Sequence, residues 1–374
     1  MSDFLPFTRP DIDEETIADV AQVLRSGWIA SGPKVVELER DLAAFIGGER
    51  RIKVMTSATG GLEMALRAFG VGPGMEVIVP AMSFAASANV VVRVGATPVF
   101  IDVELRSRNA TPAAFAAAIT PRTRALMPVH FAGLAVDMDG VNQLAKQHGL
   151  RVIEDAAHAI GTQYKGRMIG SFGDVACFSF HPNKNMTSIE GGALSYGDDS
   201  LSLAFDRERF HGISKDAAGN VDVFHAGAKY NLTDVAAAVG IGQLRRLPGF
   251  NQRRRALVEH YFKRLQGNVD PEFLPLPGDA GHSWHVFAFL LPLGRLGSSR
   301  DEFVARLRTR GIGVGVHYPS IPGLTYYQQL GAEPRAFPNA ARIGAETVTL
   351  PLFPAMTAAD VDRVCDALLE LLAR

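Results

Sequence analysis

The sequence predicts an α/β fold in two domains, and three observations support this prediction. From residue 52 onward, short apolar runs alternate with helix-like stretches, which is the pattern of parallel strands joined by crossover helices. The chain has 374 residues, more than a single domain usually holds. It contains no internal repeat and no low-complexity linker. We therefore expect a large domain with a mostly parallel sheet over residues 1–248 and a smaller α+β domain over residues 249–374.

Two helices are expected before the sheet begins. Residues 11–25 open with acids, carry apolar side chains at helical spacing and end at a Ser-Gly pair. A second helix is expected over residues 35–45. The turn-rich loop between them contains Trp28. A tryptophan in such a loop usually anchors packing, and a place in a ligand pocket is the alternative that we keep for Trp28.

Seven short apolar runs predict the strands of the sheet. In sheets of this kind ligands bind at the carboxyl ends of the strands, where loops from several strands meet. The expected strands cover residues 53–55, 76–80, 98–102, 125–129, 151–154, 175–180 and 193–196.

The loop after the first strand has the sequence TSATGG and leads into a helix that is expected to begin near Gly60. Small residues let the backbone approach a ligand, and the unpaired amides of a helix start favour an anion. The loop is therefore a candidate phosphate site. Ser57 or Thr59 fits an N-cap equally well, and one hydroxyl can serve both purposes. Glu63 must point away from a bound phosphate if this interpretation is right.

Asp155 follows the strand RVIE, so its carboxylate is expected at the ligand edge of the sheet. It would be able to bond a protonated ring nitrogen there. A helix N-cap is an equally good interpretation of Asp155 from the local sequence. Glu154 should point to the opposite face because strand side chains alternate, and it is better interpreted as structural.

Lys184 follows the apolar strand VACFSF after a short polar turn. A lysine at the end of a buried strand loses hydration, which lowers the pKa of its amine toward the neutral form that attacks a carbonyl. Taken alone, the local pattern favours an exposed loop lysine, and only the other motifs change that interpretation. His181 in the same turn is more often structural than a general base.

The later part of the chain is expected to begin as a polar loop over residues 207–234, in which Asp234 is interpreted as a helix cap. A connecting helix should follow over residues 252–265, and its run of three arginines is most simply a solvated face. The remaining expected elements are a strand over residues 285–292, a helix over 299–310, a strand over 314–317 and a helix over 357–372.

Composition describes an ordinary globular protein. Apolar residues make up 47% of the chain, charged residues 21%, and the formal net charge is −1, so no basic nucleic-acid surface is expected. Cys177 and Cys365 lie far apart and suggest neither a disulfide framework nor a metal site, which fits a reducing cytoplasm. The first residues lack the pattern of a signal peptide, and no run is apolar and long enough to span a membrane. We therefore expect no membrane, no nucleic acid and no metal.

The motifs in their order and spacing resemble those of the DegT/DnrJ/EryC1/StrS aminotransferases. The strongest likeness lies in SFHPNKNMTSIEGGAL, which contains Lys184, and in VIEDAAHAIG, which contains Asp155. Matching stretches cover nearly the whole chain: SGWIASGPKV, VMTSATGGLEMAL, PAMSFAASAN, GATPVFIDV, PVHFAG, KYNLTD and GVHYP. The nearest likeness is to the branch that makes UDP-4-amino-4-deoxy-L-arabinose, through SATGG, ITPRTRALMPVHFAG, EDAAHAIGT, KYNLTD and LPLFPAMT.

The resemblance implies a pyridoxal phosphate (PLP) enzyme of fold type I, in which Lys184 holds the cofactor covalently and moves the proton while Asp155 holds the pyridinium nitrogen. It further implies that Phe84 stacks on the ring and that His158, where many members have glutamine, contacts the phenolic oxygen. Phosphate contacts are implied for Ala58, Thr59, Ser179 and, from the partner subunit of a homodimer, Asn231, and substrate contacts for Lys229 and His317. The family commonly has glycine at the position of Ala58.

The implied reaction is transamination of a keto-sugar, most plausibly at the 4-keto position of a nucleotide-linked sugar, with glutamate as the usual donor. Relatives that dehydrate deoxysugars have histidine in place of Lys184, so the lysine argues against that branch. Two alternatives stay open: a transaminase of the same family that acts on a non-sugar amine or keto compound, and a non-catalytic regulatory protein on the same scaffold.

Overall fold

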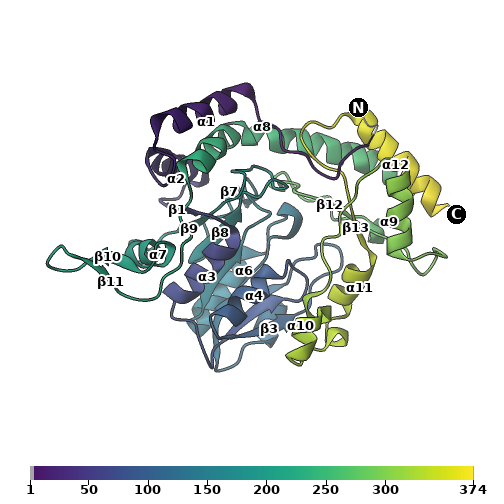
Figure 1. Ribbon diagram of the computed structural model, residues 1–374. Coiled ribbons are helices and arrows are strands. Elements are labelled where there is room, and N and C mark those ends of the chain that lie inside the picture. The colour runs from purple at the N-terminus through teal and green to yellow at the C-terminus, as the bar shows by residue number, and fades with distance from the viewer. Residues whose placement is uncertain (1–3, 374) are drawn as a thin grey trace.

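The structure is a computed structural model that describes residues 4–373 and is built around one seven-stranded sheet (Figure 1). The strands, in the order in which they pair, are β1 (Arg51–Met55), β9 (Gly192–Tyr196), β8 (Val175–Ser179), β5 (Arg151–Asp155), β4 (Thr123–Leu126), β2 (Glu76–Pro80) and β3 (Thr97–Ile101). β9 runs antiparallel to β1 and β8, and the remaining pairs are parallel. Each of the seven apolar runs forms one strand, and the mostly parallel sheet is confirmed.

Side chains of the strands alternate between two apolar cores, one on each face of the sheet. In β8, Val175 and Cys177 pack into one core, and Ala176 and Phe178 pack into the other. The first core includes residues of α3 (Ala58–Ala68), α4 (Ala86–Arg93) and α7 (Ser202–Arg209). The second core includes residues of α2 (Pro33–Ile46), α5 (Pro112–Ala117), α6 (Met138–His148) and α8 (Asp234–Leu265). Helices therefore cover both faces, as parallel sheets require.

The first expected helix forms α1 (Glu14–Ser26), and the second lies within α2. Asp234 is a helix cap as expected, although the helix that it caps is α2 and not its own. Its carboxylate accepts hydrogen bonds from the backbone N–H groups of Gly32, Lys34 and Val35, at 2.8, 3.1 and 3.0 Å. Thr233 caps α8 through the N–H of Ala236.

The helix expected over residues 252–265 is the second half of a much longer one, because α8 continues through Pro248. The division of the chain at residue 248 therefore falls inside a helix and stays a prediction. Within the arginine run, Arg254 is buried and donates to the carbonyls of His285 and Leu352, at 3.1 and 2.8 Å. This arginine joins α8 to the later part of the chain and is not a solvated residue.

After α8 the chain forms a small antiparallel pair with flanking helices. The pair consists of β12 (Phe287–Leu290) and β13 (Thr347–Leu350), and the helices are α9 (Arg300–Thr309), α10 (Thr325–Gln329), α11 (Pro338–Glu346) and α12 (Ala358–Leu372). The strand expected over residues 314–317 was wrong, because only Gly315 pairs, in an isolated bridge to Thr349. Pro319 has no N–H with which to extend such a ladder.

Short elements complete the fold. The polar loop over residues 207–234 contains a hairpin, β10 (Ile213–Lys215) and β11 (Val221–Val223), that projects from the body of the molecule (Figure 1). A second small hairpin joins β6 (Gln163–Tyr164) and β7 (Arg167–Met168). Short 3-10 helices are η1 (Phe131–Gly133), η2 (Asp199–Leu201), η3 (Pro271–Phe273), η4 (Ile321–Gly323) and η5 (Pro334–Ala336).

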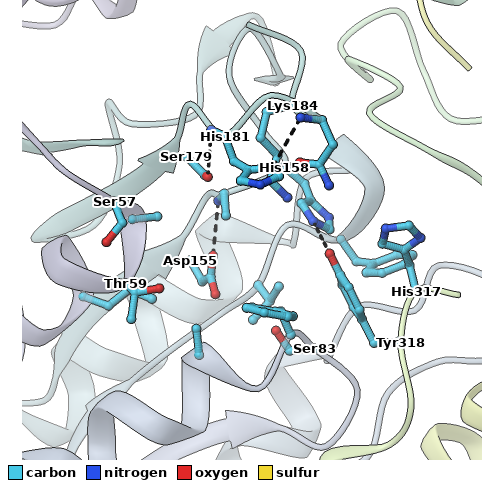
Figure 2. Close-up of a pocket in the computed structure, with 18 of the residues that line it drawn as sticks. Ser57, Thr59, Ser83, Asp155, His158, Ser179, His181, Lys184, His317 and Tyr318 are labelled. Carbon is cyan, nitrogen blue, oxygen red and sulfur yellow. Dashed lines mark hydrogen bonds between the residues drawn. The ribbon is translucent and has the colours of Figure 1, made fainter. Parts of the chain in front are cut away.

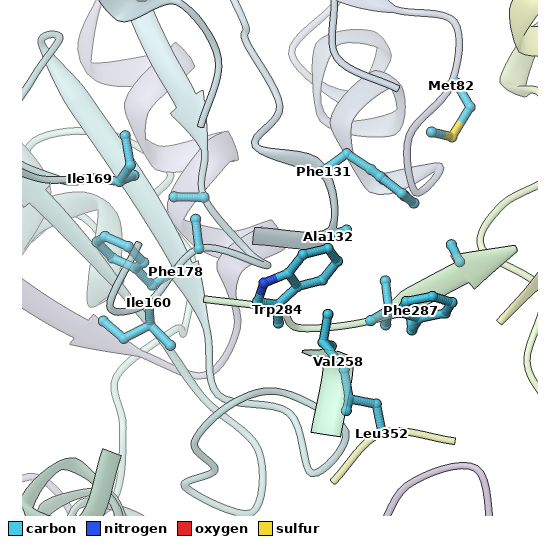
Figure 3. Close-up of a cluster of buried hydrophobic side chains, with 14 of the residues drawn as sticks. Met82, Phe131, Ala132, Ile160, Ile169, Phe178, Val258, Trp284, Phe287 and Leu352 are labelled. Atoms are coloured by element: carbon cyan, nitrogen blue, oxygen red, sulfur yellow. The ribbon is translucent and has the colours of Figure 1, made fainter. Parts of the chain in front are cut away.

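One apolar core joins the sheet to the later part of the chain. Figure 3 shows Phe178 of β8 in the same cluster as Trp284, Phe287 and Leu352, and all four side chains are buried. Loops from the C-terminal part are therefore held rigidly beside the carboxyl ends of the strands. Across residues 4–373, no helix combines the length and the apolar character needed to cross a membrane.

Replacing Asp234 with alanine should lower the free energy of unfolding by about 1 to 3 kcal/mol, because three N–H groups at the start of α2 lose their acceptor. The measurement is urea denaturation followed by circular dichroism. The control is Asp366→Ala, which removes an exposed ion pair with Arg264 and should cost less than about 1 kcal/mol. Equal losses in the two variants would contradict the capping role.

Candidate active site

The carboxyl ends of five strands surround a cavity of about 350 Å³. It is lined by Ala58 after β1, Ser83 after β2, Val129 after β4, Asp155 at the end of β5 and Ser179 at the end of β8. His317 and Tyr318 close the cavity from the C-terminal part of the chain (Figure 2). The site therefore lies where parallel sheets usually bind ligands, and its size suits a small organic molecule.

Most of the residues singled out from the sequence meet in this cavity. Those that line it are Ala58, Thr59, Phe84, Asp155, His158, Ser179, Lys184 and His317. Trp28, Lys229 and Asn231 are not among its lining residues. Placement in the cavity does not by itself test the individual roles, which stay predictions.

Lys184 is held in a tight turn just after β8, where its backbone N–H donates to the carbonyl of His181 at 2.9 Å. Burial lowers the pKa of Lys184 to about 8, and the negative charge of Asp155 partly opposes that shift. The desolvation expected from the sequence is thus present. The neutral form, which is able to act as a nucleophile, is therefore more accessible near neutral pH than for an ordinary lysine.

Asp155 is buried and held by neighbours on both oxygens. One oxygen accepts from the hydroxyl of Ser87 at 2.6 Å, and the other from the N–H of Ala157 at 3.2 Å. The hydroxyl of Ser83 lies 2.7 Å from that of Ser87 and extends the chain of contacts. These bonds fix the carboxylate at the cavity wall. Glu154 points to the opposite face, as expected, and meets His130 at 2.9 Å.

The loop after β1 forms the start of α3, which begins at Ala58 and not at Gly60. Ser57 is the N-cap, since its hydroxyl accepts from the N–H of Gly60 at 3.1 Å. This leaves the hydroxyl of Thr59 and the first amides of the helix available to an anion in the cavity. The two interpretations of this loop, cap and phosphate site, are therefore compatible.

Glu63 points away from this anion site, as the interpretation required. Its carboxylate binds Arg67 at 2.8 Å and Arg93 at 2.7 Å, and the hydroxyl of Tyr230 at 3.1 Å. The ring of Tyr230 also packs on Gly60, where an added Cβ would lie only 3.2 Å from it. The negative charge of the buried Glu63 is neutralised by these two arginines and does not oppose a phosphate.

His158 is buried, and both of its ring nitrogens are occupied. Nδ1 lies 3.2 Å from the backbone N–H of Ala132, and Nε2 lies 2.9 Å from the hydroxyl of Tyr318. Burial and the nearby charge of Lys184 hold the pKa of His158 well below its usual value, so the ring is neutral. The expected contact between His158 and a cofactor oxygen would require one of these partners to be displaced.

His317 reaches the cavity from the C-terminal part. Its Nδ1 lies 2.9 Å from the hydroxyl of Thr349, and its ring stacks on Phe7 at 5.2 Å between centroids. Burial lowers the pKa of His317 to about 3, with smaller effects from Lys184 and Arg108. It therefore faces a ligand as a neutral hydrogen-bonding group.

Phe84 is the most open aromatic residue of the site. It is 58% exposed, and its ring lies 5.5 Å from that of Tyr318 at an angle of 52°. A large apolar side chain exposed at a cavity is a surface on which a flat ring can stack.

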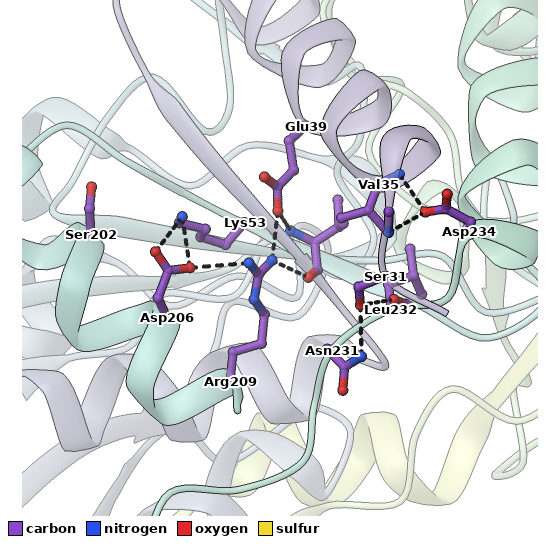
Figure 4. Close-up of polar contacts among 12 residues, drawn as sticks. Ser31, Val35, Glu39, Lys53, Ser202, Asp206, Arg209, Asn231, Leu232 and Asp234 are labelled. Carbon is purple, nitrogen blue, oxygen red and sulfur yellow. Dashed lines mark hydrogen bonds and ion pairs between the residues drawn. The ribbon is translucent and has the colours of Figure 1, made fainter. Parts of the chain in front are cut away.

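The three remaining candidates are not among the residues that line the cavity. Lys229 and Asn231 belong to the segment that precedes α8, where Figure 4 shows Asn231 beside Ser31, and Trp28 lies in the loop between α1 and α2. Asn231 donates to the hydroxyl of Ser31 at 2.7 Å and also bonds the amine of Lys229. Trp28 is 65% exposed in the same region. None of these side chains contributes to the cavity of its own subunit.

Sequence reasoning missed two residues that the structure brings to the site, Ser87 and Tyr318. Ser87 lies in the run PAMSFAASAN and Tyr318 in GVHYP, so both belong to stretches already singled out for their neighbours. A serine gives no local signal that it will meet a carboxylate 68 residues later in the chain.

Comparison with known proteins decides the family. The profile of the DegT/DnrJ/EryC1/StrS aminotransferase family matches residues 10–369. The chain belongs to this family. It is accordingly a PLP-dependent aminotransferase of fold type I, as the sequence motifs implied.

Solved structures agree with the family assignment over the full chain. DesV of Streptomyces venezuelae, solved with a ketimine intermediate, is 34% identical with a TM-score of 0.90, and the match covers 100% of both chains. PseC of Helicobacter pylori, an aminotransferase of pseudoaminic acid biosynthesis, is 28% identical with a TM-score of 0.92, also over 100% of both chains. Spr1654 of Streptococcus pneumoniae, a candidate sugar aminotransferase solved in its PLP form, is 32% identical with a TM-score of 0.91 over 99% of both chains.

The residues of the cavity fit PLP chemically. The cofactor needs an amine for its aldehyde, a carboxylate for its ring nitrogen and an anion site for its phosphate. Lys184, Asp155 and the start of α3 provide these three groups around one cavity.

In the apo protein, Lys184 should react with an amine-directed acylating reagent with a pH midpoint of about 8, because burial lowers its pKa. Asp155→Asn should move the midpoint lower still, since the carboxylate opposes that shift. Labelling is read by mass spectrometry of the Lys184 peptide, and the exposed Lys215 should respond equally in both proteins. A midpoint near 10.5, the ordinary value for lysine, would show that Lys184 is solvated.

Proposed function

We propose that the protein transfers an amino group to a keto-sugar, with Lys184 as the residue that binds the cofactor and moves the proton. The observation that carries this proposal is that the partly buried Lys184 shares one cavity with the fixed carboxylate of Asp155. When bound, PLP supplies the electron sink that makes amino-group exchange possible.

Each cavity residue then has a role that its position supports. Asp155 keeps the ring nitrogen protonated, and Ser87 and Ala157 hold the carboxylate in place. Thr59 and Ser179, with the first amides of α3, bind the phosphate. Phe84 stacks on the ring, and the neutral His158 and His317 orient it and the substrate without adding charge.

The proposed acceptor is a nucleotide-linked sugar with a 4-keto group, and the proposed donor is L-glutamate. PseC, which matches the whole chain, acts in the biosynthesis of an amino sugar, and the motif likeness is to an enzyme of UDP-linked sugars. Phe84, His181 and Glu190 line the cavity and are exposed, so the cavity reaches the surface beside them and a large substituent on the sugar could extend outward.

The proposed assembly is a homodimer in which each subunit completes the site of the other. Large apolar side chains are exposed near the segment of Asn231, as expected for a surface that a partner covers. They include Trp28, Ile29, Val221, Val223 and Phe224, at 65, 50, 73, 60 and 44% exposure. Lys229 and Asn231 follow Phe224 closely in the chain and are not among the residues that line their own cavity.

We further propose that the protein works in the cytoplasm. Cys177 and Cys365 are both free and buried, which fits a reducing compartment.

The enzyme loaded with PLP should convert a UDP-linked 4-keto-sugar and L-glutamate to the amino-sugar and 2-oxoglutarate, detected by mass spectrometry. Lys184→Ala should still bind PLP through the phosphate contacts and should lose at least about 10²-fold in turnover, because the proton-transferring amine is gone. Turnover near the wild-type rate would contradict the role of Lys184. If the enzyme converts simple keto acids or amines but does not convert the sugar nucleotide, the non-sugar alternative is favoured.

Asn231→Asp should weaken PLP binding, because it places a carboxylate against the cofactor phosphate. If the contact crosses the dimer, a Lys184→Ala chain paired with an Asn231→Asp chain forms one doubly damaged site and one intact site. Reassembly of equal amounts makes half of the dimers mixed, so about a quarter of all sites should recover. The assay is transamination after the two variants are dissociated and reassembled together with PLP.

Each variant reassembled alone is the control for this complementation. If confirmed mixed dimers have no more activity than these controls, Asn231 acts in its own subunit or outside the site.

A further inference from the structure

The side of the cavity opposite the phosphate site contains His158 and Tyr318. Figure 2 shows Ser57 and Thr59 on one side of Asp155, and His158, Tyr318 and His317 on the other. In PLP, one ring carbon carries the aldehyde. The phosphate arm and the phenolic oxygen are attached to the ring carbons on either side of it. With the phosphate at the start of α3, as proposed above, the phenolic oxygen is directed toward the side of His158 and Tyr318.

The contacts of His158 fix its tautomer. A backbone N–H has no lone pair, so the contact of Nδ1 with Ala132 at 3.2 Å makes Nδ1 an acceptor without a proton. A neutral imidazole then carries its single proton on Nε2. Nε2 must therefore donate to the hydroxyl oxygen of Tyr318, 2.9 Å away. His158 has no further proton to offer a ligand.

Tyr318 consequently accepts from His158 and keeps its own proton for another acceptor. Across residues 4–373, its hydroxyl shows no hydrogen bond besides the one to His158. Tyr318 lines the cavity, so this proton is available to a molecule bound there. Burial and the negative charge of Asp155 raise the pKa of Tyr318 above its usual value, which keeps the hydroxyl protonated.

We propose that the hydroxyl of Tyr318, oriented by His158, donates the hydrogen bond to the phenolic oxygen of the cofactor. His158 is then a positioning residue, and Tyr318 is the group in contact with the cofactor. This assigns Tyr318 a role that the sequence did not, and it rests on the proposed orientation of PLP between Lys184 and Asp155.

The bond has a defined electronic consequence. A donor at the phenolic oxygen withdraws electron density from it, so the neighbouring nitrogen that links Lys184 to the cofactor binds its proton less tightly. Loss of the donor should raise the pH at which this nitrogen loses its proton, and the absorbance of the bound cofactor reports that change. A purely structural role for Tyr318 would not move this midpoint.

The test is a pH titration of the cofactor absorbance in the PLP-loaded enzyme without substrate. Tyr318→Phe keeps the aromatic packing against Phe84 and removes only the hydroxyl, and it should raise the midpoint by about one unit. Tyr164→Phe, which removes a hydroxyl bonded to Asp137 outside the cavity, is the matched control and should leave the midpoint unchanged. The other titratable cavity residues stay the same in these variants: Asp155, His158, His181, Lys184, Glu190 and His317.

The variant His158→Leu tests whether His158 acts through Tyr318 or contacts the cofactor itself. It should raise the midpoint in the same direction as Tyr318→Phe, and the double variant should add little, because both changes remove one shared interaction. A shift in His158→Leu with no shift in Tyr318→Phe would overturn the proposal and assign the contact to His158 itself. An unchanged midpoint in Tyr318→Phe, whatever His158→Leu does, also overturns it.

Failure of the proposed function is distinguishable in the same experiment. If the wild-type protein shows no pH-dependent cofactor absorbance, or if Lys184→Ala gives the same titration, the covalent role of Lys184 is wrong. A normal wild-type titration that is unaffected by Tyr318→Phe refutes only the assignment of the tyrosine.

Discussion

The partial burial of Lys184 at the carboxyl edge of the sheet is the constraint on which the rest of the site depends. An ammonium group loses hydration in this position, so the surroundings favour its neutral form. Asp155 restores part of the stability of the charged form, but it bonds Ser87 and Ala157 and forms no ion pair with the lysine. The amine can therefore be present in either its neutral or its charged form. A group that attacks a carbonyl in one form and carries a proton in the other needs both.

Burial also keeps side chains uncharged on the other side of the cavity. His158 and His317 are neutral because of burial, and Tyr318 is protonated for the same reason. The carboxylate of Glu63, in the same helix as Thr59, is turned away from the cavity and neutralised by Arg67 and Arg93. Lys184 and Asp155 are thus the charged groups in the interior of the cavity, while His181 and Glu190 lie at its exposed side.

The sequence predicted the sheet well because each strand contains a short apolar run between turn residues, and the inner strand β8 and its neighbour β9 are buried along most of their length. Strand position alone did not single out Lys184 or Asp155, since an exposed loop lysine and a helix N-cap fitted the local sequence at least as well; the family motifs did. The structure places Asp155 at the end of β5 and Lys184 in the turn after β8, both at the cavity. The sequence prediction failed where the structure depends on residues far apart in the chain. Asp234 caps α2, and one of its hydrogen-bond partners, Lys34, lies 200 residues earlier. Helix α8 passes through Pro248 because packing outweighs the local tendency of proline to end a helix. Periodicity carries no information about contacts of this kind.

The position of Tyr318 follows from these long-range contacts. Gly315 pairs briefly with Thr349, and Thr349 and Thr347 bind the ring and the carbonyl of His317. The chain is thus anchored to β13 as far as His317. It then turns into the cavity, where Tyr318 bonds His158. The contact joins a loop after β5 to a segment 160 residues later. A change in how the C-terminal part packs on the sheet would therefore move Tyr318 directly, and it would also reach the turn of Lys184, because Asn185 donates to the carbonyl of Ser283 at 2.9 Å. Asp155 would be affected least, because it lies on β5 and bonds Ser87.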